Sequence, residues 1–137
     1  MTGFRRRRDQ GGAAAVEFGL IMIPFFVLVF GLLEYGWYFY VAQNTSGAAS
    51  TVARKMEVGD CWASGEAQAF AHSQSGQVTS VTNSLNATAS PAAGTAFTVT
   101  VVADGKLLNF LPIPDGGTIT RTVSAQVEDE EPTSCWG

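Results

Sequence analysis

Few side chains in this chain of 137 residues could carry out covalent chemistry. There is one histidine, His72, and there are two cysteines, Cys61 and Cys135. Zinc and iron–sulfur sites normally draw more ligands than these from such side chains. His72 lies in a polar stretch and is interpreted as a surface residue, and the run Glu128–Glu131 is interpreted as a solvated acidic tail. We therefore predict that the protein is not an enzyme and has no catalytic residues, no metal site and no cofactor.

Glu17 is the residue with the most unusual setting. It is the only charged residue in the apolar run from Ala13 to Leu33. An ionisable side chain in such a run is costly unless it is paired, and by default it indicates a function. The simpler interpretation is a carboxylate in the first turn of a helix, where the helix dipole favours it. Pro24 removes one backbone donor and frees the carbonyl of Leu20, so a kink or loosening is expected there, although membrane helices tolerate proline.

The apolar run has the length of a membrane span. As a helix its 21 residues would cover about 31 Å, against a hydrocarbon core of about 30 Å. Aromatic residues at positions 35–40 follow it, as is typical of a membrane–water interface. The arginines Arg5–Arg8 precede it, and the positive-inside rule then places the N-terminus in the cytoplasm. We predict a single-pass cytoplasmic-membrane protein with its span at residues 13–34 and its C-terminal domain outside.

A cleaved secretory signal peptide is a competing interpretation of this N-terminal region. Small residues at positions 46–49 would suit it, but the apolar run exceeds the roughly 7–15 residues of a signal sequence. The aromatic residues also lie where small residues would be needed for cleavage. The composition fits a membrane protein, since only 15% of the residues are charged, against about 25% in soluble domains, and 46% are hydrophobic. This balance excludes a disordered chain.

The residues around Glu17 form a motif. After Arg5–Arg8 the sequence reads Gly11-Gly12-Ala13-Ala14-Ala15-Val16-Glu17-Phe18. A basic leader, a glycine, four small or apolar residues, and then a glutamate and an aromatic residue at the head of an apolar helix resemble the type IV prepilin processing motif. Together with Pro24 and with Glu34-Tyr35-Gly36, the motif is similar to that of the TadE-like proteins of tight-adherence (Tad) pilus systems. The close resemblance runs from Arg5 to about Arg54.

The resemblance implies processing by a membrane prepilin peptidase on the cytoplasmic side. The cut would follow Gly12, remove the leader at residues 1–12 and make Ala13 the new N-terminus, with Glu17 as its fifth residue. The carboxylate of Glu17 would then neutralise the α-amine of Ala13 in the same or a neighbouring subunit, an attraction that is stronger at low dielectric constant. The mature chain would keep four cations and eleven anions, a net charge of −7. The residues expected to act in subunit assembly are Ala13, Glu17, Phe18 and Pro24.

The helix is expected to continue beyond the membrane. Apolar residues recur at helical spacing after the aromatic residues, and Gly59 suits a helix stop. A continuous helix over Ala13–Val58, 46 residues, would be about 69 Å long. A short second helix is expected at residues 63–73. The apolar face of the long helix consists of Val41, Ala48, Ala49, Val52 and Met56.

Strand patterns follow the helices. Apolar residues alternate with polar residues near 97–101 and near 119–127, and a third candidate strand covers 77–85. The segments 86–94 and 112–117 contain the proline and glycine residues of loops. We predict an α+β fold in which a long N-terminal pilin-type helix spans the membrane in its first half. A small C-terminal antiparallel β-sheet would pack on the outer half of that helix.

Cys61 and Cys135 both lie outside the cytoplasm in this topology. An even pair of cysteines in an oxidising compartment predicts one disulfide, which would close the exported domain at residues 59–137. The bridge would close a loop of about 75 residues and stabilise the domain by roughly 4 kcal/mol in the chain-entropy model. Two free thiols or a shared metal are the alternative.

The resemblance leads to one functional hypothesis and leaves one alternative. The hypothesis is a minor pilin or pseudopilin, because the major subunit of such systems is little more than a helix, whereas this chain continues beyond its helix. It would be incorporated into, or initiate, a Tad pilus used for adhesion or DNA uptake and would reach the pilus or cell surface. Its partners would be the prepilin peptidase, other major and minor pilin subunits, and the cytoplasmic membrane before assembly, with nucleic acid met only through the pilus. The alternative is an uncleaved, membrane-anchored exported binding domain.

Overall fold

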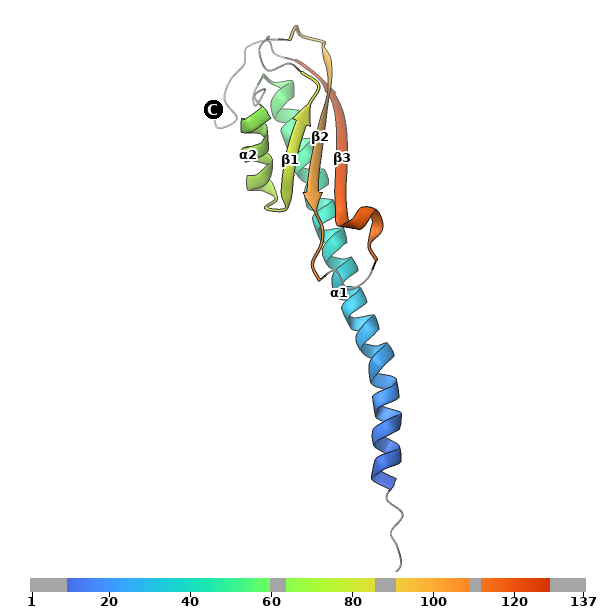
Figure 1. Cartoon of the computed structure of the whole chain (residues 1–137). Helices are drawn as coiled ribbons and strands as arrows, with labels where there is room; N and C mark the ends of the chain where they lie inside the picture. The colour runs from blue at the N-terminus through green and yellow to red at the C-terminus, as the bar shows by residue number, and fades with distance from the viewer. Residues whose placement is uncertain (1–9, 60–63, 86–90, 109–111, 129–137) are drawn as a thin grey trace, which may run out of the picture.

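The computed structural model describes residues 10–59, 64–85, 91–108 and 112–128. The elements, in chain order, are helices α1 (Gln10–Glu57) and α2 (Ser64–Gln74), strands β1 (Val78–Asn83) and β2 (Ala96–Asp104), a short 3₁₀ turn η1 (Pro114–Gly117), and strand β3 (Thr118–Gln126). The N-terminal half of α1 projects as a stalk from a domain that is built on its C-terminal half (Figure 1). The predicted α+β fold, a long helix followed by a small antiparallel sheet, is confirmed.

α1 is a single helix of 48 residues, which corresponds to about 72 Å. It begins at Gln10, three residues before Ala13. It continues as helix through Pro24, because a proline removes only one backbone donor and membrane-type helices accommodate that loss. The stop expected at Gly59 is present, since Gly59 has a φ of 90° and its N–H donates to the carbonyl of Met56 at 3.3 Å.

The sheet has three antiparallel strands in the order β1-β2-β3. The register pairs Val99 with Val123 and Thr100 with Thr122, and the hydroxyl oxygens of the two threonines lie 3.1 Å apart on the solvated face. Phe97 and Val101 are buried on the opposite face, as their alternation predicts. The sheet therefore has one solvent-exposed face rich in threonine and one buried face toward α1.

The main core lies between the buried face of the sheet, the outer half of α1, and α2. The predicted apolar face of α1 is confirmed, because each of its five residues is at most 1% exposed. α2 contributes Ala67, Phe70 and Ala71 and lies beside β1 (Figure 1). The buried side chains on α1 and the sheet are Ala48, Ala49, Val52, Ala53, Met56, Val78, Val81, Phe97, Val99, Val101 and Val127. Burial of this apolar surface fixes the domain on the helix.

A second, smaller cluster joins the sheet to α1 nearer the stalk. It contains Val41 and Ala42 of α1 and Ala103 and Ile119 of the sheet, with the partly buried Trp37 and Tyr38 against it. Gly105 lies in the same contact, where its N–H donates to the carbonyl of Gly117 at 2.8 Å. A Cβ at Gly105 would lie 2.7 Å from Cδ1 of Ile119 and 3.1 Å from Cδ2 of Tyr38. A larger residue at position 105 would therefore require the side chains of Ile119 and Tyr38 to shift.

Several predictions concern residues outside the part of the chain just described. Cys61 and Cys135, and with them the predicted disulfide, fall in the gaps, as do the arginines Arg5–Arg8 and most of the acidic run Glu128–Glu131. The described residue of that run, Glu128, is exposed, and its N–H donates to the carbonyl of Glu57 at the end of α1.

Candidate functional site

The predicted processing and assembly residues all lie on the exposed stalk of α1. Gly12, Ala13, Glu17, Phe18 and Pro24 are each exposed. The bond between Gly12 and Ala13 falls in the first turn of α1, where the leading N–H groups have no partners within the helix. Ala13 and Glu17 are four residues apart, so they lie on the same face of the helix one turn from each other.

Glu17 stands alone on this face of the stalk. Within the described parts of the chain no ion pair reaches its carboxylate, and its neighbours are apolar. A cation generated at Ala13 would be separated from this carboxylate by one helical turn, about 6 Å along the axis. The spacing therefore places position 13 and the Glu17 carboxylate one turn apart on one face of α1.

The stalk presents an apolar surface on all sides. In the most apolar stretch of α1 no residue is buried, and α1 is the one helix among the described residues that is long and apolar enough to cross a membrane. Leu20 and Leu28, for example, are 73% and 67% exposed. The other large exposed residues of the stalk are Val16, Phe18, Ile21, Ile23, Phe25, Phe26, Val27, Phe30, Leu32 and Leu33. A surface of this kind requires lipid or other helices around it.

The stalk ends where a segment of the sheet domain returns to α1. The chain between β2 and β3 extends past the end of the sheet toward α1 (Figure 1), and there the hydroxyl of Tyr35 donates to the carbonyl of Pro112 at 2.9 Å. Glu34 is fully buried at the same level, although Leu33 on one side is 54% exposed. Within the motif Glu34-Tyr35-Gly36, which the sequence places at the end of the span, Tyr35 thus bonds to this segment.

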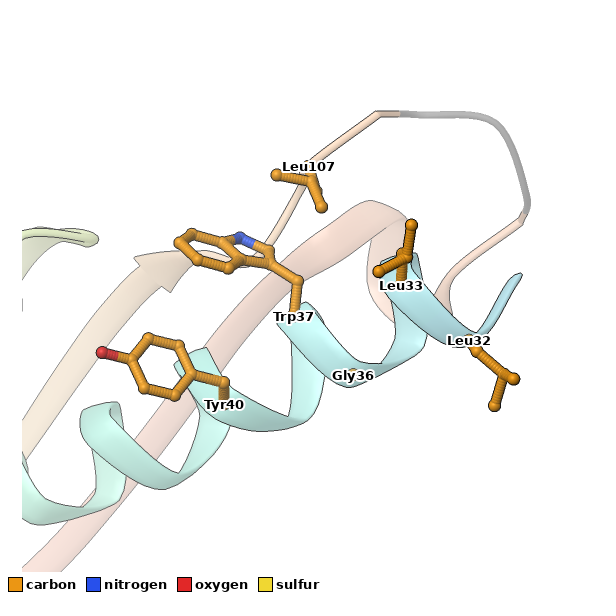
Figure 2. A pocket seen from close by; sticks show the side chains of 6 residues that line it. All are labelled: Leu32, Leu33, Gly36, Trp37, Tyr40 and Leu107. Carbon is orange, nitrogen blue, oxygen red and sulfur yellow. The ribbon is translucent and has the colours of Figure 1, made fainter. Parts of the chain in front are cut away.

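A shallow groove lies beside this contact. It is bounded by α1 on one side and by Leu107, on the segment after β2, on the other (Figure 2). The residues that line it are Leu32, Leu33, Gly36, Trp37, Tyr40 and Leu107. Sequence reasoning did not identify this groove, because Leu107 is about seventy positions from Trp37 and no local pattern connects them.

Of the side chains considered for catalysis or metal binding, only His72 and Glu128 lie within the described residues. His72 is exposed in the last turn of α2. Within the residues that the structure describes, there is no group of three or more histidine, cysteine, aspartate or glutamate side chains that could hold a metal ion. The geometry therefore directs attention to the stalk and its junction with the domain.

The comparison with protein families concerns this same helix. Residues 12–54 match the model of the TadE-like protein family. The resemblance drawn from the motif is confirmed over this range. TadE-like proteins are pilin-like proteins associated with Tad pili, a structural and non-enzymatic kind of protein. The comparisons with curated proteins and with solved structures found no significant match.

The TadE-like match coincides with α1 and stops before the rest of the domain. It begins two residues into the helix and ends three residues before Glu57, so it covers the stalk, the aromatic residues and all of the apolar helix face except Met56. α2 and the three strands lie outside it. The match therefore supports a role for the helix and leaves the role of the sheet to structural argument.

Proposed function

We propose that the protein is a minor pilin or pseudopilin that a prepilin peptidase cuts after Gly12 and that then joins, or initiates, a Tad pilus. The observation that carries the proposal is that the helix matched by the TadE-like family carries Gly12, Ala13, Glu17 and Phe18 exposed on an apolar stalk, below the domain that packs on its outer half. The pilus would serve adhesion or DNA uptake, so contact with nucleic acid would occur through the assembled fibre.

Exposure of Gly12 supports the processing step. A Cβ at Gly12 would meet no atom of the described structure within 4 Å, so the fold itself does not require glycine there. A requirement for glycine at this position would come from the peptidase. The bond after Gly12 lies in the first turn of α1, and little helix must unwind to bring it into an active site.

The apolar stalk and Glu17 support the assembly step. Before assembly, lipid would surround the stalk, with Arg5–Arg8 keeping the N-terminus in the cytoplasm. Cleavage removes these arginines and creates the amine of Ala13, which Glu17 can neutralise in the same or a neighbouring subunit. In the fibre, neighbouring pilin helices would take the place of lipid around the stalk.

The folded domain supports a minor rather than a major subunit. A main core and a second cluster fix three strands and α2 on the outer half of α1. This domain is a large addition to the helix that alone would suffice for a bulk fibre subunit. The alternative, an uncleaved membrane-anchored binding domain, would use the same fold without release of the leader.

The N-terminal sequence and intact mass of the protein from native membranes and sheared pili test the proposal. We expect an N-terminus at Ala13. Gly12→Val should keep its leader, whereas Gly19→Val, a matched change at a second open position on α1, should be cut like the wild type. An intact leader on the wild type, in cells with an active prepilin peptidase, would favour the anchored domain. An N-terminus near residue 48 would instead indicate a signal peptide.

A further inference from the structure

The segment between β2 and β3 reaches the end of the stalk. Of this segment the structure describes residues 105–108 and 112–117. In residues 105–108, Leu107 lines one groove with Leu33 and Trp37 of α1 (Figure 2). In residues 112–117, the carbonyl of Pro112 accepts a hydrogen bond from Tyr35. Both parts of the segment therefore contact α1 within residues 32–40, where the predicted span meets the aromatic residues.

The described residues 105–108 end in two exposed leucines, Leu107 and Leu108, which are called the tip below. Leu107 is 46% and Leu108 is 52% exposed, and they follow the exposed Lys106. On the α1 side, Phe39 is 62% and Tyr40 is 57% exposed. Leucine side chains beside tyrosine and tryptophan are the composition of surfaces that lie in the interface of a bilayer.

We propose that this tip, Leu107 and Leu108, inserts into the outer interface of the lipid bilayer and gives the protein a second membrane contact beside α1. The inference rests on the proposed insertion of the stalk. Leu32 and Leu33, the last residues of the apolar run, line the same groove as Leu107. Lipid that surrounds Leu33 would therefore also contact Leu107.

Lipid suits this surface before assembly for two reasons. The apolar surface is continuous from the stalk through the groove to the tip, so a bilayer that covers the stalk covers the tip without a further partner. The described residues of the segment also carry one cation, Lys106, and one anion, Asp115, so their charges balance. The contact is then apolar rather than electrostatic, and added salt should not release it.

The test measures the depth of nitroxide labels on the full-length protein, held as single copies in nanodiscs of phosphatidylethanolamine and phosphatidylglycerol. A keto amino acid that carries the label replaces Leu108, so the native cysteines stay unchanged. Matched labels replace Leu28 in the stalk and Thr120 on the exposed part of β3. Collision with dissolved oxygen reports lipid, and collision with a nickel chelate reports water. Circular dichroism of each labelled protein checks the fold.

We expect an oxygen-to-nickel ratio at position 108 that is several-fold above that at 120 and below that at 28, and unchanged at high salt. A ratio at 108 equal to that at 120, with 28 in lipid, would overturn the inference and leave the proposed membrane insertion standing. Water contact at 28 would overturn both. Shielding of 108 in sheared pili but not in nanodiscs would identify a neighbouring pilin as the occupant and also overturn the inference.

Discussion

The carboxylate of Glu17 is expected to neutralise the α-amine that cleavage creates at Ala13. Glu17→Gln keeps the size of the side chain and removes its charge. Cleavage after Gly12 should continue, but incorporation into pili should fall, because an unpaired charge in an apolar environment costs up to about 3 kcal/mol. Immunoblots of the membrane and sheared-pilus fractions measure this partition. Glu128→Gln, the same change at an exposed position of the domain, is the control. Normal incorporation of Glu17→Gln would remove the proposed role of the carboxylate.

Gly105 lies close to Ile119 of β3 and Tyr38 of α1. Gly105→Ala would place a Cβ 2.7 Å from Cδ1 of Ile119 and 3.1 Å from Cδ2 of Tyr38, so these packed side chains must shift. We expect the free energy of unfolding of the domain to fall by about 1–3 kcal/mol, as for other overpacked sites. Denaturant unfolding of the full-length protein in detergent, followed by circular dichroism, measures the change. Gly76→Ala, at a position with no atom within 4 Å, should change stability little. Equal effects of the two variants would contradict this account of the contact.

At the scale of elements, the hydrogen bond from Tyr35 to Pro112 holds the segment between β2 and β3 on α1. Tyr35→Phe removes only the donor, at a cost of about 0.5–1.5 kcal/mol for such a bond. Amide hydrogen exchange should therefore become faster at residues 113 and 115–117, while exchange in β2 and β3 stays unchanged. Tyr40→Phe is the control, because the hydroxyl of Tyr40 makes no hydrogen bond within the described parts of the chain. Unchanged exchange in Tyr35→Phe would mean that other contacts hold the segment.

The sequence predicts the elements better than it predicts the contacts between them. α1, α2 and the three strands are foreseen to within a few residues, because helical spacing and alternation are local patterns. The sheet face toward α1 is foreseen for the same reason. The groove at Leu107 and the hydrogen bond from Tyr35 to Pro112 are not foreseen, because they depend on a segment that returns to α1 across about seventy residues or more. The start of α1 at Gln10 is also missed, since Gly11 and Gly12 disfavour helix locally.

At the scale of the whole molecule, one helix serves two environments. Its outer half is buried against a sheet and a second helix, and its N-terminal half is covered by nothing in the described structure. The hydrogen bond from Glu128 to Glu57 brings the chain after β3 back to the end of α1, at 2.7 Å. The segment that follows Glu57 and the segment that follows Glu128 each lead to a cysteine. Cys61 lies four residues after Glu57 and Cys135 seven after Glu128, spans of up to about 13 Å and 23 Å. The predicted bridge is therefore within reach.

That bridge should contribute roughly 4 kcal/mol to the stability of the domain in the chain-entropy model. Cys61→Ser should lower the melting temperature of the full-length protein under non-reducing conditions, and Cys135→Ser should lower it by the same amount. The double variant should be no less stable than either single variant, because one bond can be lost only once. Intact mass before and after reduction provides the chemical control. Additive losses in the double variant, or melting temperatures that match the wild type, would indicate two free thiols. The domain would then depend on its apolar core alone to stay folded.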